Sequence, residues 1–111
     1  MDTTNKFIIE HFGPSHREAM RTMSDLVYRE VKDFKIYSEG IIRDLQGETD
    51  DADAIKETRD YADKEIEDMK YQGVQRIAGL AKSFGMDLDS CLELQRCGEE
   101  DLRLIKISRS K

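Results

Sequence analysis

Two long segments with a helical pattern of apolar residues flank the sequence Asp44-Leu45-Gln46-Gly47-Glu48-Thr49-Asp50-Asp51. We expect Gly47 to end the first segment and Thr49 or Asp50 to begin the second. The acidic residues at the second start favour a helix there, because carboxylates stabilise the positive end of the helix dipole. A connection of about three residues makes neighbouring helices run antiparallel. The sequence therefore predicts a long antiparallel helical hairpin.

In both segments the apolar residues recur in steps of three and four, which keeps them on one face of a helix. Between about residues 15 and 46 the stripe comprises Met20, Met23, Val27, Val31, Phe34, Ile41 and Leu45. Ser38 is the one polar residue at a stripe position. Between about residues 50 and 84 it comprises Ile55, Thr58, Ala62, Ile66, Met69, Gly73, Ile77, Leu80 and Phe84.

Three glycines lie inside these segments, at Gly40, Gly73 and Gly79. Each weakens an exposed helix interior by about 1 kcal/mol relative to alanine. Gly73 falls on the apolar stripe, so we expect another backbone to approach it closely, and Gly79 has a similar setting. We predict continuous helices, the alternative being kinks at the three glycines.

Shorter helices are expected at both ends of the chain. One spans about residues 3–12 and stops at Gly13-Pro14. Ser15 and Glu18 have the spacing of a capping box, so we place the start of the long helix at Ser15. A last helical segment spans about residues 87–107, after Gly85, with Asp87 or Asp89 as its cap. Residues 102–107 also fit a strand, but a lone strand would have nothing to pair with. The prediction is a single all-α domain over residues 1–111, a three- or four-helix bundle.

Composition excludes several functions. The 111 residues include 18 Lys plus Arg and 24 Asp plus Glu, for a formal net charge of -6. A net acidic chain is poorly suited to the phosphate backbone of nucleic acid. No apolar run approaches the roughly 18 residues that span a membrane. The N-terminus lacks the pattern of a signal peptide. We therefore expect a soluble, cytoplasmic protein by default, or a secreted one if Met1 is not the native start.

The acidic charge is concentrated in one part of the chain. Residues 44–69 contain eleven acids and three bases, a net charge of -8, whereas the remainder is nearly neutral. One interpretation is a solvated helix face stabilised by ion pairs such as Asp60 with Lys64. The other is an electrostatic docking surface for a basic protein. We take its binding residues to be Asp50, Asp51, Asp53, Asp60 and Asp63.

The leading hypothesis for function is therefore a non-catalytic protein-interaction module, with a regulatory or inhibitory role. Apolar stripes that the short helices leave uncovered favour self-association or a helical partner. Within a homo-oligomer, the acidic segment of one copy could meet the basic tail of another, formed by Arg103, Lys106, Arg109 and Lys111.

An alternative hypothesis is a small carrier of an apolar ligand such as a lipid. Helical bundles can open a cavity between their helices, and methionine adapts to irregular contacts. The cavity would be lined by Met20, Met23, Phe34, Met69 and Phe84, although the same residues are more simply explained as core.

No pattern in the sequence indicates catalysis, a cofactor or a metal site. His11 and His16 lack the partners of a helical metal site. The fold could bring them to Cys91, but the spacing does not indicate that it does. Cys91 and Cys97 allow three states: two buried thiols, an intrachain disulfide if the helix breaks between them, or an intermolecular bridge. In an unbroken helix they would be about 9 Å apart along the axis, beyond the reach of a disulfide.

Overall fold

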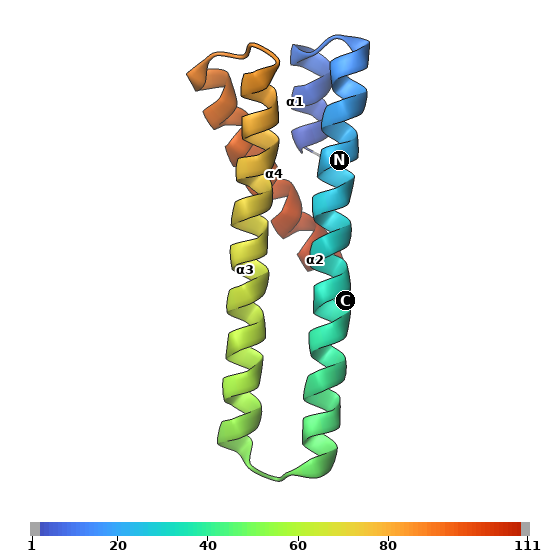
Figure 1. The fold of residues 1–111 in the computed structure, drawn as a ribbon, viewed down its shortest axis with the longest axis vertical. Helices are drawn as coiled ribbons and strands as arrows, with labels where there is room; N and C mark the ends of the chain where they lie inside the picture. Colours follow the sequence, from blue (N-terminus) through green and yellow to red (C-terminus); the bar gives the residue numbers. More distant parts are fainter. Residues whose placement is uncertain (1–2, 110–111) are drawn as a thin grey trace.

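The computed structural model describes residues 3–109, and the side chains of residues 3–100 among them. Within that range the chain forms four helices and no strand: α1 (Thr3–His11), α2 (Pro14–Glu48), α3 (Ala52–Ser83) and α4 (Leu88–Arg109). The helices α2 and α3 form a long antiparallel hairpin (Figure 1), and the molecule extends 54 Å along its longest axis. The predicted all-α fold is confirmed, with four helices.

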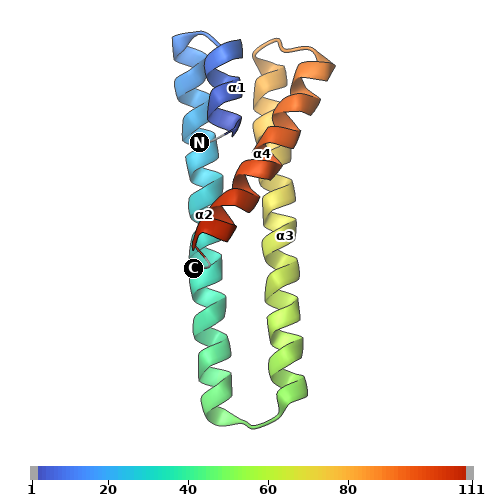
Figure 2. The same cartoon turned by 180° about the vertical axis from the view of Figure 1, so that it is seen from behind.

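The two shorter helices lie on the same face of the hairpin (Figure 2). α1 packs beside the N-terminal part of α2, and α4 descends from the C-terminal end of α3 diagonally towards the middle of α2. We call this the covered face. The opposite side, which Figure 1 presents to the reader, is not covered by any described helix, and we call it the open face. We call residues 34–69, which lie between the level of α4 and the α2–α3 turn, the distal arm.

The hydrophobic core lies in the half of the molecule that contains α1 and α4. Its largest fully buried side chains are Ile8, Met20, Val27 and Leu94, one or more from each of α1, α2 and α4. The side chains of α3 complete this core through Val74, Ile77 and Ala81. In the distal arm the buried residues are fewer, namely Ser38, Ile42, Ala62 and Ile66. The distal arm is therefore a helix pair with a thin apolar seam.

The start of α2 differs from the prediction. The N-cap is Gly13, which makes no side-chain capping bond, and Pro14 is the first helical residue. Ser15 is exposed within the first turn and is not the cap. The capping-box prediction was wrong because proline suits the first helical position, where its fixed φ matches the helix and its missing N–H is not needed.

Capping explains the turn of the hairpin. α2 continues one residue past Gly47, to Glu48, and the N–H of Thr49 donates to the Leu45 carbonyl at 3.0 Å. α3 begins only at Ala52, because a carboxylate oxygen of Asp51 accepts from the N–H groups of Asp53 and Ala54 at 3.1 and 3.3 Å. An aspartate in this position satisfies N–H groups that have no partner within the helix. The predicted start at Thr49 or Asp50 was therefore slightly early.

The α3–α4 connection follows the sequence closely. Gly85 has a φ of +91°, a conformation that glycine adopts without strain, and it ends α3 as predicted. Asp87 caps α4, since its Oδ1 accepts from the N–H of Ser90 at 2.7 Å. α4 runs unbroken through Gly98 to Arg109, so the helix preferred for residues 102–107 is confirmed.

The buried stripes are shifted and widened relative to the prediction. On α2 the buried residue near the turn is Ile42, whereas Ile41 is 42% exposed. On α3 the residues Lys70, Val74 and Ala81 are also buried, because α4 covers a second side of this helix.

The glycine predictions have mixed outcomes. Both long helices are continuous. Gly73 does lie close to α2, but the atoms that meet it belong to the side chain of Val27 and not to a backbone, and a side chain at Gly40 or Gly79 would meet only open space. The expected packing role for Gly79 was wrong.

Candidate protein-binding surface

The five aspartates predicted to bind a partner are all exposed and all lie in the distal arm. Asp50 and Asp51 are in the turn, where Asp51 also caps α3. Asp53, Asp60 and Asp63 are on α3. Asp63 precedes the buried Lys70 by two helical turns, and Asp60 precedes Val74 by four. Residues at that spacing share a side of the helix, so these aspartates continue the covered side of α3 beyond the reach of α4.

The open face carries a second apolar stripe on α2, two members of which, Phe34 and Ile41, the sequence pattern had assigned to the core stripe. It begins at Leu26, which is 41% exposed, and continues in the distal arm through half-buried Phe34, Tyr37 at 65% exposure and Ile41 at 42%. The rings of Phe34 and Tyr37 contact each other with centroids 6.4 Å apart. Steps of three and four from Met23 would have revealed this stripe.

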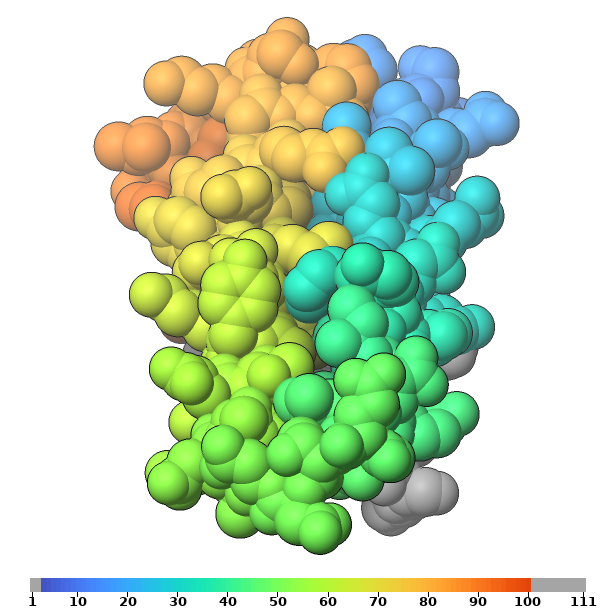
Figure 3. All heavy atoms as spheres, turned by 60° about the horizontal axis from the view of Figure 1, so that its bottom comes forward, coloured from blue at the N-terminus to red at the C-terminus, as the bar shows by residue number. Residues whose placement is uncertain are grey.

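An ion pair on the open face shows which residues of α2 and α3 share that face. Glu30 Oε2 and Arg76 Nη1 are 3.0 Å apart across the hairpin, and both side chains are nearly half exposed. Tyr37 follows Glu30 by two turns of α2, and the half-buried Met69 precedes Arg76 by two turns of α3. These residues therefore lie on the same face as the ion pair. Figure 3 shows this face with the turn end towards the reader and no other helix in front of it.

Carboxylates border the apolar stripe. Asp44 follows Tyr37 by two turns, Glu48 follows Ile41 by two turns, and both are exposed. On α3, the half-buried Glu65 lies one turn before Met69. The open face of the distal arm thus combines exposed aromatic and aliphatic side chains with acidic ones.

The five residues of the alternative ligand cavity do not form one site. Met20 is fully buried in the core, and Met23 and Phe84 pack against that core. Phe34 and Met69 are half-buried farther along the hairpin and do not belong to this cluster.

An open cleft of about 310 Å³ lies between the α1–α2 and α3–α4 turns, lined by His11, Phe12, Gly13, His16, Phe84, Gly85, Met86, Asp87 and Ser90. Both imidazoles stack on phenylalanine rings. The centroids are 3.9 Å apart for His11 and Phe7, and 4.2 Å for His16 and Phe84. Both histidines are nevertheless exposed. The fold brings the histidines to the start of α4, but Cys91 is buried outside this lining.

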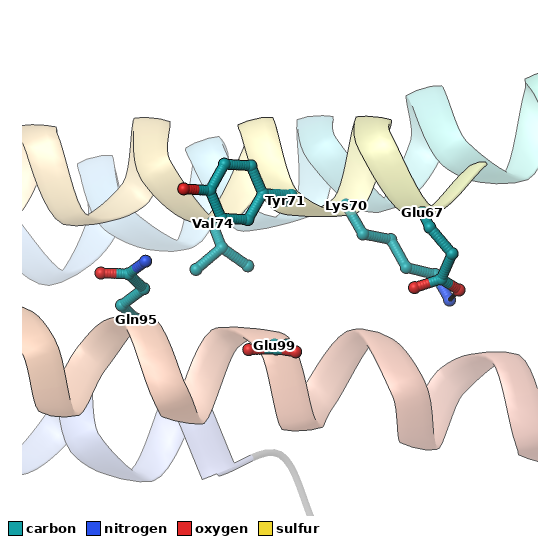
Figure 4. A pocket seen from close by; sticks show the side chains of 6 residues that line it. All are labelled: Glu67, Lys70, Tyr71, Val74, Gln95 and Glu99. Carbon is teal, nitrogen blue, oxygen red and sulfur yellow. Dashed lines mark hydrogen bonds and ion pairs between the residues drawn. The ribbon is translucent and has the colours of Figure 1, made fainter. Parts of the chain in front are cut away.

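A buried lysine is the other feature that the sequence analysis missed. Lys70 is only 4% exposed, and its Nζ lies 3.3 Å from Glu67 Oε1. Figure 4 shows the pair where α4 crosses α3, beside a cavity of about 40 Å³ that Gln95 and Glu99 of α4 also line. A buried charge is tolerated where a partner compensates it, so the pair is consistent with helix packing. A lone lysine in an otherwise exposed charge pattern gives no signal of burial.

Cys91 and Cys97 form no disulfide with each other, and each is 6% exposed on the unbroken α4. Their burial on different sides of one helix is explained by the position of α4, which contacts both α1 and α3. The burial of both residues agrees with the first of the three predicted states; the bridge between two chains stays a prediction. The basic tail proposed for self-association lies outside the residues whose side chains are described.

Among the side chains of residues 3–100, no group of three or more His, Cys, Asp and Glu is arranged to hold a metal ion. No helix in the described part of the chain combines the length and apolarity needed to cross a membrane. Comparisons with models of known protein families, with curated proteins and with solved structures found no match to the chain.

Proposed function

We propose that this protein is a non-catalytic interaction module whose distal arm binds a basic protein partner. The observation that carries the proposal is the division of the molecule into two unlike halves. The core side chains gather beside α1 and α4, whereas in the distal arm Tyr37 and Ile41 lie together on the open face of α2 and remain 65% and 42% exposed. Exposed apolar side chains grouped in this way are typical of interaction sites.

The charge of the same region supports a basic partner. Residues 44–69 carry a net charge of -8, and all five predicted aspartates are exposed in the structure. Complementary charge speeds encounter and selects partners more than it adds affinity. We infer that the acidic arm attracts the partner and that apolar contacts hold it, so that occupation of the arm could regulate or inhibit the partner.

The test is affinity capture from an extract of cells that express the protein. The acid variant changes Asp50, Asp51, Asp53, Asp60 and Asp63 to Asn. The Asn at residue 51 still caps the helix, because Asn and Asp are comparable N-caps. The matched control removes five exposed acids elsewhere, through Glu10→Gln, Glu18→Gln, Asp25→Asn, Asp89→Asn and Glu100→Gln.

We expect one basic protein to be retained by the wild type and by the control but lost by the acid variant. Its retention should fall as salt rises from about 0.1 to about 1 M, since salt screens exposed charges. Retention that is equal for the two variants, or that ignores salt, would contradict an acidic docking surface.

A further inference from the structure

We propose that the open face of the distal arm binds one amphipathic helix with basic flanks, lying lengthwise between α2 and α3. This inference rests on the proposed function and names the class of partner and its site. It places the contact on the open face, centred on Tyr37 and Ile41, and not on the side of α3 that carries Asp53, Asp60 and Asp63.

The geometry suits a helix. Phe34, Tyr37 and Ile41 follow each other at steps of three and four along α2, and Met69 lies on the open face of α3. An apolar row on one helix with an apolar residue beside it on the neighbouring helix suits a third helix, whose own anchors recur at i, i+3, i+4 and i+7. The ion pair between Glu30 and Arg76 bounds the row at the end nearer α1.

The packing of the distal arm is incomplete. Nearer the core, α1 and α4 bury side chains of both hairpin helices, but this core includes no side chain of the distal arm, and no third helix covers the open face among the described residues (Figure 1). Tyr37 remains 65% exposed and Ile41 42%. A third helix would bury both, and aromatic anchors of this kind contribute much of the energy at interfaces.

Charge decides between the candidate occupants. Asp44, Glu48 and Glu65 border the apolar row, and the stripe positions 34, 37, 41, 44 and 48 of α2 contain no base. A helix with Lys or Arg flanking its apolar side would pair with these carboxylates. In a second copy of this chain the corresponding face is itself acidic, and like charges across an interface are unfavourable. The basic helix is therefore the occupant that the observations favour.

The experiment measures binding of a designed peptide to the full chain by fluorescence anisotropy. The peptide has about 18 residues, or five helical turns, with Leu at steps of three and four and Lys and Arg on the flanks. A scrambled peptide of the same composition keeps the charge but loses the apolar side. Sedimentation velocity of the free protein is recorded in parallel.

We expect the designed peptide to bind at least about tenfold more tightly than the scrambled one. The double variant Tyr37→Ala/Ile41→Ala should weaken binding about tenfold or more, as loss of interface anchors does. The matched control is Ile36→Ala, because Ile36 is 59% exposed on the same helix but points away from this face. It should leave the affinity unchanged.

A second pair of variants tests the charges. Asp44→Asn/Glu48→Gln/Glu65→Gln should weaken binding several-fold more than Asp53→Asn/Asp60→Asn/Asp63→Asn, although both remove three charges. If the two triple variants weakened binding equally, the peptide would not prefer the open face, and the proposal would be overturned. Equal binding of the two peptides, or a tenfold effect of Ile36→Ala, would overturn it as well.

A dimer of the free protein that is lost in the Tyr37/Ile41 variant would also overturn the proposal, by showing that a second copy covers this face. The two proposals can fail separately. Loss of partner capture in the five-aspartate variant, with peptide binding that ignores Tyr37, would retain the proposed function and reject this site. Peptide binding that depends on Tyr37, without capture of any basic protein, would retain this site and reject the proposed function.

Discussion

The backbone of Gly73 lies against the side chain of Val27, so closely that a Cβ placed on Gly73 would be 2.3 Å from Val27 Cγ1. Both residues are buried, one on each helix of the hairpin. Since Cβ atoms do not approach other carbon atoms so closely, the contact requires glycine. It lets α2 and α3 come together where the core begins.

We expect Gly73→Ala to lower the free energy of unfolding by about 1–3 kcal/mol, the usual cost of overpacking a core. This loss outweighs the helix propensity of alanine, which favours the variant by about 1 kcal/mol. Urea unfolding followed by circular dichroism gives the measurement. Gly79→Ala is the matched control, because nothing lies within 4 Å of its added Cβ. It should be neutral or raise stability by up to about 1 kcal/mol.

The contact itself is tested by a double-mutant cycle with Val27→Ala. Truncating Val27 alone leaves a cavity and destabilises the core, but it also makes room for a methyl group at residue 73. We therefore expect the double variant to be more stable than the sum of the single effects by about 1 kcal/mol or more. Additive effects would show that Gly73 and Val27 do not restrict each other.

A second prediction concerns the turn of the hairpin. Asp51 accepts hydrogen bonds from the N–H groups of Asp53 and Ala54. Asp51→Ala should therefore lower the free energy of unfolding by about 1 kcal/mol, whereas Asp51→Asn should change it little. The control is Asp50→Ala, an exposed neighbour that is not the cap, with an expected effect within about 0.5 kcal/mol. If Asp50→Ala and Asp51→Ala were equally destabilising in urea, the cap would not explain where α3 begins.

A third prediction follows from the cap of α4. The N–H of Ser90 donates to the Asp87 carboxylate, and this bond, with help from the Ser90 hydroxyl, holds the pKa of Asp87 below its ordinary value. The folded state therefore binds this proton less readily than the unfolded state does. The resulting stabilisation is present above the ordinary aspartate pKa of about 3.9 and is lost as the pH falls through the lower, folded value.

Asp87→Asn keeps an oxygen that can accept from Ser90 but cannot titrate. Its free energy of unfolding should consequently fall less steeply than that of the wild type between about pH 4 and about pH 2. Urea unfolding curves at a series of pH values compare the two slopes. Parallel slopes would mean that Asp87 has no part in the acid sensitivity of the protein.

The sequence was sufficient for the helices and the hairpin because both follow from local rules. Spacings of three and four define α2 and α3, and Gly85 and Asp87 mark the α3–α4 turn by their backbone and capping chemistry. The sequence did not indicate where α4 would pack on the hairpin. That helix covers one side of α3, which buries Lys70 and Val74, and it leaves the other side of the hairpin open.

The candidate surface was predicted only in part for the same reason. The five aspartates could be recognised by their charge, and their exposure follows from it. Ile41, however, lies three residues after Ser38 and four after Tyr37, so its position fits both the core stripe and the open-face stripe of α2. Only tertiary packing decides that Ile42 faces the core and that Ile41 joins Tyr37 on the open face.

The last prediction concerns the thiols of α4. Cys91 and Cys97 are separated by six residues of continuous helix, or about 9 Å along its axis, whereas a disulfide brings two Cα atoms within about 7 Å. We expect a thiol-specific reagent to titrate two thiols in the denatured protein, with or without prior reduction. In the native protein both should react slowly, because each is 6% exposed and must wait for local opening of the helix.

A Ser15→Cys variant provides an exposed thiol in the same molecule, which should react at once. Two thiols that appear only after reduction would mean that α4 breaks between Cys91 and Cys97 or that a bridge joins two copies of the chain. Two thiols that react as fast as the cysteine introduced at position 15 would mean that α4 does not pack against α1 and α3.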